Sequence, residues 1–173
     1  MITASLVLLL SLQAPGLPPD WELKPKAEKA AEDVGRLRPL LERLQPPAWV
    51  AAGAPAAYEK QWRDCLEGIG HVQETALRLA GQPARLSLAV ETLVRLEALL
   101  EHTGSLAQAV RRYQNPAIAD VLESEAAAAG ASRAWLRQHV QDLAVQRELE
   151  LEAAESEAQR CRVQVNRPGA RKP

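Results

Sequence analysis

Residues 115–165, NPAIADVLESEAAAAGASRAWLRQHVQDLAVQRELELEAAESEAQRCRVQV, decide the fold of this chain. The segment begins with Asn115-Pro116, a pair that suits the cap and the first turn of a helix. Apolar residues then recur at spacings of three and four, which predicts one buried face of a helix: Ile118, Leu122, Ala129, Leu136, Val140 and Leu143. Gly130-Ala131-Ser132 is the one place where we expect the helix to break, with Ser132 capping a new helix.

The same spacing continues beyond Leu143 as a heptad-like seam rich in alanine. Its members are Arg147, Leu151, Ala154, Ala158, Cys161 and Val165. This helix is longer than the pattern of roughly 30 residues before it, so its end outruns its neighbour and leaves apolar surface uncovered. We therefore predict a protein-contact surface on the terminal helix, over residues 134–165. The alternative is that the first helix of the chain covers the seam.

Three further helical patterns precede this segment. The first runs over residues 24–44, and Pro39 predicts a kink or a break into two pieces because proline clashes with the carbonyl four residues back. The second opens at 53–55 and stops at Gly81-Gln82-Pro83, and the third follows over 84–113. Short connections between long amphipathic helices favour antiparallel neighbours. We predict an all-α fold, an up-and-down antiparallel bundle of about four helices with a long C-terminal helix.

Each of these helices has a predicted buried face. In the first helix it consists of Ala27, Ala30, Val34, Leu37, Leu41 and Leu44. In the second it consists of Tyr58, Trp62, Cys65, Ile69, Val72, Ala76 and Leu79. In the third it consists of Leu86, Val90, Leu93, Leu96, Leu100, Ala107 and Val110.

The chain begins with an uncharged apolar run followed by small residues, as in a secretory signal. We expect residues 1–14 to form a signal peptide cut near Ala14-Pro15, and the protein to be secreted or periplasmic. Residues 15–23 are expected to be an extended leader, 24–165 the helical domain and 166–173 a disordered basic tail. No segment reaches the roughly 20 apolar residues of a membrane span, so we expect no stable membrane insertion after signal cleavage.

The two cysteines, Cys65 and Cys161, would meet an oxidising compartment after export. An intramolecular disulfide would need a sharply bent last helix or a different topology, because the heights of the two cysteines along their helices differ by far more than the roughly 7 Å that a bridge allows between Cα atoms. Parallel self-association through the terminal seam would instead bring the two copies of Cys161 together. Persistence of a covalent dimer in a Cys161→Ser variant would contradict that arrangement.

The composition argues against several classes of function. A formal net charge of -1 gives no basic face for nucleic acid. The serines fall in helical patterns or caps, without the strained Gly-x-Ser-x-Gly turn of a nucleophile, and there is no phosphate-binding or dinucleotide-binding glycine loop. We therefore expect a protein that is not an enzyme, and we assign no catalytic, cofactor-binding or metal-binding residue and no cofactor.

One alternative is a bundle that binds a small molecule or a metal, centred on Gly68, Gly70, His71 and Glu74. Glu67 shares the helix face of His71 and Glu74, and two carboxylates with one imidazole can hold a divalent ion loosely. Helical glycines permit the close approach of a second backbone or a flat ligand, although tight packing or a local bend explains them more simply. The prediction that we favour is an exported, non-enzymatic helical-bundle protein that acts through protein-protein contacts.

Overall fold

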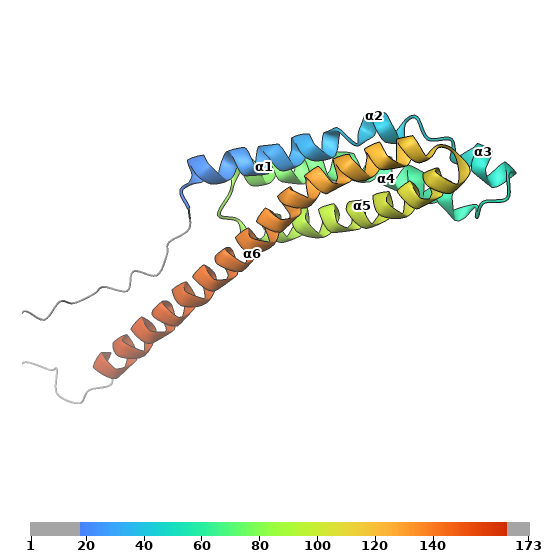
Figure 1. The fold of residues 1–173 in the computed structure, drawn as a ribbon. Coiled ribbons are helices and arrows are strands. Elements are labelled where there is room, and N and C mark those ends of the chain that lie inside the picture. Colours follow the sequence, from blue (N-terminus) through green and yellow to red (C-terminus); the bar gives the residue numbers. More distant parts are fainter. Residues whose placement is uncertain (1–17, 166–173) are drawn as a thin grey trace, which may run out of the picture.

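The computed structural model describes residues 18–165, which form the antiparallel helical bundle of Figure 1 and confirm the predicted fold class. Its four long helices are α1 (Asp20–Gly35), α4 (Ala57–Gly81), α5 (Leu86–Tyr113) and α6 (Pro116–Val165). Two short helices, α2 (Arg38–Leu41) and α3 (Pro46–Ala51), connect α1 to α4. The predicted signal peptide and basic tail lie outside the described residues. No helix in the described part is long and apolar enough to cross a membrane.

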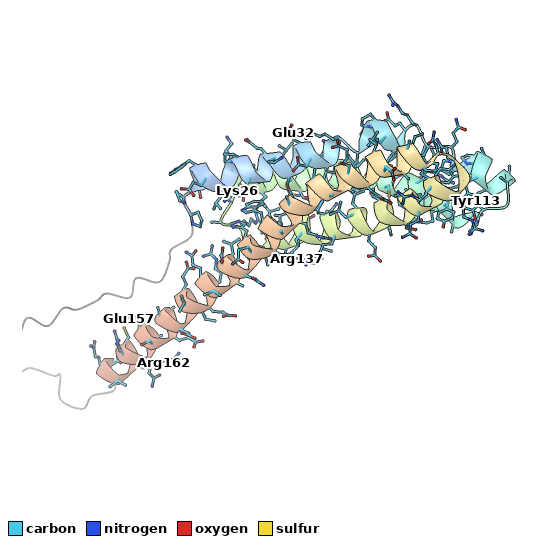
Figure 2. All side chains as sticks on the ribbon, viewed as in Figure 1. Lys26, Glu32, Tyr113, Arg137, Glu157 and Arg162 are labelled. Atoms are coloured by element: carbon cyan, nitrogen blue, oxygen red, sulfur yellow. The ribbon has the colours of Figure 1, made fainter. Side chains whose placement is uncertain are left out.

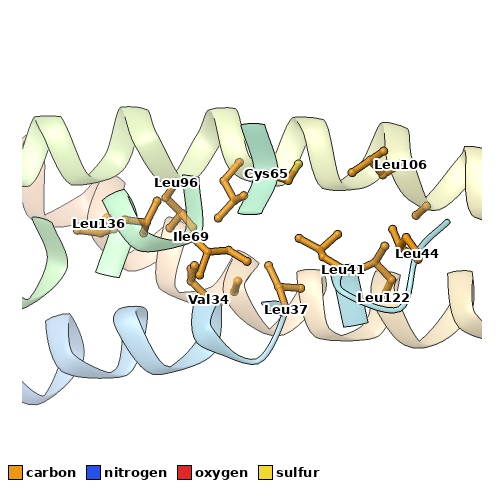
Figure 3. Close-up of a cluster of buried hydrophobic side chains, with 14 of the residues drawn as sticks. Val34, Leu37, Leu41, Leu44, Cys65, Ile69, Leu96, Leu106, Leu122 and Leu136 are labelled. Atoms are coloured by element: carbon orange, nitrogen blue, oxygen red, sulfur yellow. The ribbon is translucent and has the colours of Figure 1, made fainter. Parts of the chain in front are cut away.

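The four long helices close a ring around one main core. α1 packs against α4 and α6, and α5 packs against the same two helices from the other side. All six residues of the first predicted face, from Ala27 to Leu44, are buried, which confirms that prediction. Figure 3 shows leucine, isoleucine and valine side chains from all four sides of the bundle meeting in this core.

The start of α1 differs from the prediction. The helix begins at Asp20, four residues before the expected Lys24, so the extended leader is shorter than predicted. Asp20 and Glu22 in the first turn favour an early start because their charges complement the helix dipole. Pro25 lies inside the helix, where its missing N–H removes one backbone hydrogen bond. Pro39 breaks the first pattern into α1 and α2, as predicted.

Helix α3 was not predicted, since the first helical pattern was expected to end at residue 44 and the second to open at 53–55. Pro46 and Pro47 occupy the first positions of α3, where a missing N–H costs no hydrogen bond. The short helix buries Trp49, whose indole Nε1 donates a hydrogen bond to Gln114 Oε1 at 3.1 Å. Trp49 therefore belongs to the core and is not available to a partner.

The buried face of α5 was only partly predicted. Leu88, Leu99 and Leu106 are buried although they were not assigned to it, and the predicted Leu86, Leu93 and Leu100 are only half-buried. Val90 is 40% exposed, whereas Thr92 and Thr103 are buried. Both threonine hydroxyls donate to the carbonyl four residues back, Thr92 to Leu88 at 2.7 Å and Thr103 to Leu99 at 2.8 Å. This internal bond makes burial of a hydroxyl inexpensive. Apolar residues occur all around α5, so spacing alone did not identify its inner face.

Helix α6 is one unbroken helix, and the break predicted at Gly130-Ala131-Ser132 is wrong. Ser132 does not cap a helix: its hydroxyl donates to buried Asp33 Oδ2 of α1 at 2.9 Å. At the start of α6, Asn115 Oδ1 accepts the N–H of Ala117 at 2.8 Å, which confirms the predicted cap. Continuity through Gly130 lets α6 project as a single rod.

Candidate protein-contact surface

The end of α6 leaves the bundle as a projecting helix. At a rise of about 1.5 Å per residue, the 50 residues of α6 span about 75 Å and the 28 residues of α5 about 42 Å. Every residue over 147–165 is exposed. We call residues 148–165 the arm, which Figure 1 shows extending alone beyond the bundle. α1 does not cover it, so the alternative in which the first helix covers the seam is wrong.

Buried contacts on the last turns inside the bundle fix the direction of the arm. His139 is buried, its Nε2 donates to the carbonyl of Pro83 at 2.8 Å, and its ring stacks on Trp135 at 5.3 Å. About two helical turns further on, the Arg147 guanidinium donates to the carbonyl of Ala84 at 3.1 Å. The turn between α4 and α5 therefore holds α6 at the point where the arm begins.

Polar contacts also set the position of α6 against its two neighbours. The Asp33 carboxylate, inaccessible to solvent, accepts hydrogen bonds from Ser132 and from Lys29 Nζ at 2.7 Å, which joins α1 to α6. On the opposite side, Arg137 of α6 forms an ion pair with Glu97 of α5 at 2.5 Å. The bundle part of α6 is therefore anchored on both flanks, and the arm extends from a fixed base.

The seam of the arm continues the buried face of α6. At about 100° per residue, Leu136, Val140 and Leu143 project within about 80° of the seam residues that follow them. The bundle covers this face only as far as Leu143. Beyond it, Leu151 is 59% exposed and Val165 is 83% exposed. The same face of one helix is thus core at one end and solvent-exposed at the other.

Charges on the arm are ordered along its length. Residues 148–157 contain five glutamates and no base, whereas residues 158–165 contain Arg160 and Arg162 and no acid. Within the arm, Arg160 pairs with Glu157 at 3.5 Å, and Cys161 Sγ lies 3.9 Å from the same carboxylate. Figure 2 shows Glu157 and Arg162 on the projecting part of the helix.

One carboxylate at the base of the arm is held in its charged form. Arg147 donates to Glu150 at 2.5 Å and Gln146 donates to it at 2.9 Å. The hydrogen bond from Arg147, followed by that from Gln146, lowers the pKa of Glu150. The first turn of the arm therefore keeps its negative charge.

An open pocket lies beside the base of the arm. Asp20, residues 81–85 and Arg147 line it. The two arginines already have partners, because Arg147 binds the Ala84 carbonyl and Arg85 Nη1 donates to Gln82 Oε1 at 3.1 Å. This pocket therefore serves the contact between α6 and the α4–α5 turn.

The structure places the residues of the alternative site on the surface of α4. Glu67, His71 and Glu74 are all exposed, and residues 18–165 contain no group of three or more His, Cys, Asp or Glu side chains placed to hold a metal ion. A Cβ on Gly68 would meet Leu99 Cδ1 at an ordinary 3.5 Å, and one on Gly70 would meet nothing within 4 Å. The expectation that tight packing requires these glycines is therefore wrong.

Replacing Gly70 by alanine should raise the free energy of unfolding by up to about 1 kcal/mol, because alanine restricts the unfolded chain and fits the open helical position. Urea denaturation would measure the change. Gly53→Ala is the matched control: Gly53 has φ 92°, so alanine there should destabilise by about 1–2 kcal/mol. A loss of stability on replacing Gly70 would show that something packs against that face.

The two cysteines are free and lie in opposite environments. Cys65 is buried in the core of the bundle, and Cys161 is exposed on the arm. Burial raises the pKa of the Cys65 thiol from 9.0 to about 11, although a hydrogen bond with Thr103 acts in the other direction. Cys65 should therefore resist alkylation in the folded protein, while Cys161 reacts.

Because the folded state holds the Cys65 proton more tightly than the unfolded state, this thiol contributes its full stability below pH 9 and loses it as the pH rises toward 11. The difference in free energy of unfolding between the parent chain and Cys65→Ala should shrink by about 2 kcal/mol between neutral pH and about pH 10.5, at about 1.4 kcal/mol per pKa unit. Urea titrations of both proteins at each pH would measure it. A difference that does not change with pH would contradict the burial of this thiol.

Comparison with models of known protein families, with curated proteins and with solved structures finds no match for this chain. What the protein does must therefore be inferred from its own residues.

Proposed function

We propose that this chain is an exported, non-enzymatic helical-bundle protein that acts through protein-protein contacts made by its arm. The observation that carries the proposal is that residues 148–165 are all exposed while their seam continues the buried face of α6. Apolar residues aligned on one face of a helix are the usual sign of a packing partner.

The bundle stabilises the arm as a helix in the absence of a partner. An isolated helix of this length is marginal in water, because nucleation is costly. Here the bundle supplies the nucleus, since α6 is already anchored through His139 and Arg147. A partner would then bind a preformed surface and lose less conformational entropy.

The proposal of export rests on the uncharged apolar run before Ala14. The proposal of a non-enzymatic role rests on the lack of a nucleophile turn or a phosphate loop in the sequence. The alternative of a metal-binding or ligand-binding bundle has less support, because Glu67, His71 and Glu74 are exposed on α4 and Gly68 faces Leu99 of the core. A secreted form that lacks residues 1–14 by mass would support export, and an uncleaved cytosolic form would contradict it.

The test compares two pairs of substitutions on the arm in full-length protein, purified from its native compartment under non-reducing conditions. Leu151→Glu with Ala158→Glu places charge on the seam, whereas Leu149→Glu with Val163→Glu places the same charge elsewhere on the exposed arm. We expect the parent and the second variant to retain a protein partner, including a second copy of the chain, and the first variant to lose it. Equal retention by both variants, or no partner for the parent chain, would contradict the proposal.

A further inference from the structure

We propose that the seam of the arm is covered by the arm of a second copy of this chain, running antiparallel to the first. This inference rests on the proposed function and names its partner. The order of charges along the arm and the small size of its central seam residues carry the inference.

The charge order selects the antiparallel direction. In a parallel pair, the five glutamates over residues 148–157 would lie beside the same five glutamates, and Arg160 and Arg162 beside their own copies. In an antiparallel pair, the arginine-bearing end of each arm lies beside the acidic start of the other. Opposite charges within a Debye length of about 8 Å attract, so the antiparallel pair is favoured.

One register covers the whole arm of both copies. When Arg147 lies opposite Val165 of the second copy, the seam residues of the two arms face each other across the interface. Leu151 then lies opposite Cys161, and Ala154 lies opposite Ala158. Two alanine layers at the centre let the helix axes approach to about 8 Å, the close end of the usual range.

The same register places Glu148 beside Arg162 of the second copy, and twofold symmetry repeats this pair. Only Glu155 and Glu157, near the symmetry axis, meet their own copies. The overlap of 19 residues is about 29 Å long, and this short contact with some like-charge repulsion predicts a weak, reversible dimer. Because the interface is isologous, it closes at two copies.

The distance between the two Cys161 residues distinguishes antiparallel from parallel pairing of the arms. In this register the two Cys161 residues are ten positions apart, or about 15 Å along the axis. That separation exceeds the roughly 7 Å between Cα atoms that a disulfide allows. Parallel pairing, in contrast, would bring the two Cys161 residues to the same height.

Sedimentation equilibrium of the full-length protein, from low to high micromolar concentration, tests self-association. We expect a monomer–dimer equilibrium that Arg160→Glu with Arg162→Glu weakens about tenfold or more, a change of about 1.4 kcal/mol. Arg43→Glu with Arg112→Glu, two exposed positions on the bundle away from the arm, is the matched control and should leave the equilibrium unchanged. A parent chain that remains monomeric throughout would overturn the inference.

Oxidative cross-linking tests the direction. We expect no disulfide-linked dimer from the parent chain, a strong one from Leu151→Cys, and none from Leu151→Cys combined with Cys161→Ser. Only antiparallel pairing requires a cysteine at both positions. A dimer linked through Cys161 alone, or no dimer from Leu151→Cys, would overturn the proposed arrangement.

The two proposals fail separately. Suppose that the parent chain is a monomer but captures another protein, and that Leu151→Glu with Ala158→Glu abolishes this capture. That result would refute pairing with a second copy and support contact through the arm. A dimer that the seam substitutions leave intact would refute both.

Discussion

Replacing Leu136 by alanine should lower the free energy of unfolding by about 2–5 kcal/mol. Leu136 is fully buried on the inner face of α6 (Figure 3), and its loss leaves a cavity between the helices. Urea denaturation followed by circular dichroism would measure the change, at a protein concentration low enough to keep the chain monomeric.

The same substitution fifteen residues further along the same face should have almost no effect. Leu151 is 59% exposed on the projecting arm, so Leu151→Ala should change the free energy of unfolding by less than about 0.5 kcal/mol. The contrast isolates burial, because residue type, helix and face are the same. Comparable losses at both positions would show that the chain covers its own arm.

The second large effect is expected at the opposite end of the bundle. Trp49→Ala should lower the free energy of unfolding by about 3–5 kcal/mol. Trp49 is only 1% exposed and lies edge-on to Tyr58, with ring centroids 6.4 Å apart. Chemical denaturation would measure the loss. Trp49→Phe should restore most of it and leave a deficit of about 1 kcal/mol for the hydrogen bond to Gln114.

Trp21 provides the matched control for this prediction. It is 72% exposed, and Trp21→Ala should change stability by less than about 0.5 kcal/mol. A small effect at Trp49 together with a large effect at Trp21 would reverse the assignment of Trp49 to the core.

The helical fold and the uncovered seam could be predicted from the sequence because both follow from the periodicity of apolar residues. Spacings of three and four located the inner faces of the first, second and last long helices. The predicted lengths of the last two helices indicated that the end of α6 projects beyond α5. These features depend on local pattern alone.

The features that the sequence did not predict depend on tertiary contacts. Nothing local distinguishes Asp33 from the surrounding charged residues of α1, and only its contact with Ser132 of α6 explains its burial. Prolines at 46 and 47 suit either a loop or a first helical turn, and the burial of Trp49 decides between them. A glycine likewise breaks a long helix only where packing does not hold the segments before and after it. Around Gly130 packing holds both segments, and α6 is continuous.

The central claim is that the protein's own chain leaves the arm uncovered. Hydrogen exchange of the full-length protein, measured in dilute solution by mass spectrometry, tests this claim most directly. We expect amides over 136–143 to exchange only with global unfolding, and amides over 151–165 to exchange orders of magnitude faster because that helix frays independently. Equal protection of both segments in the monomer would show that the chain covers the arm, and would contradict the account.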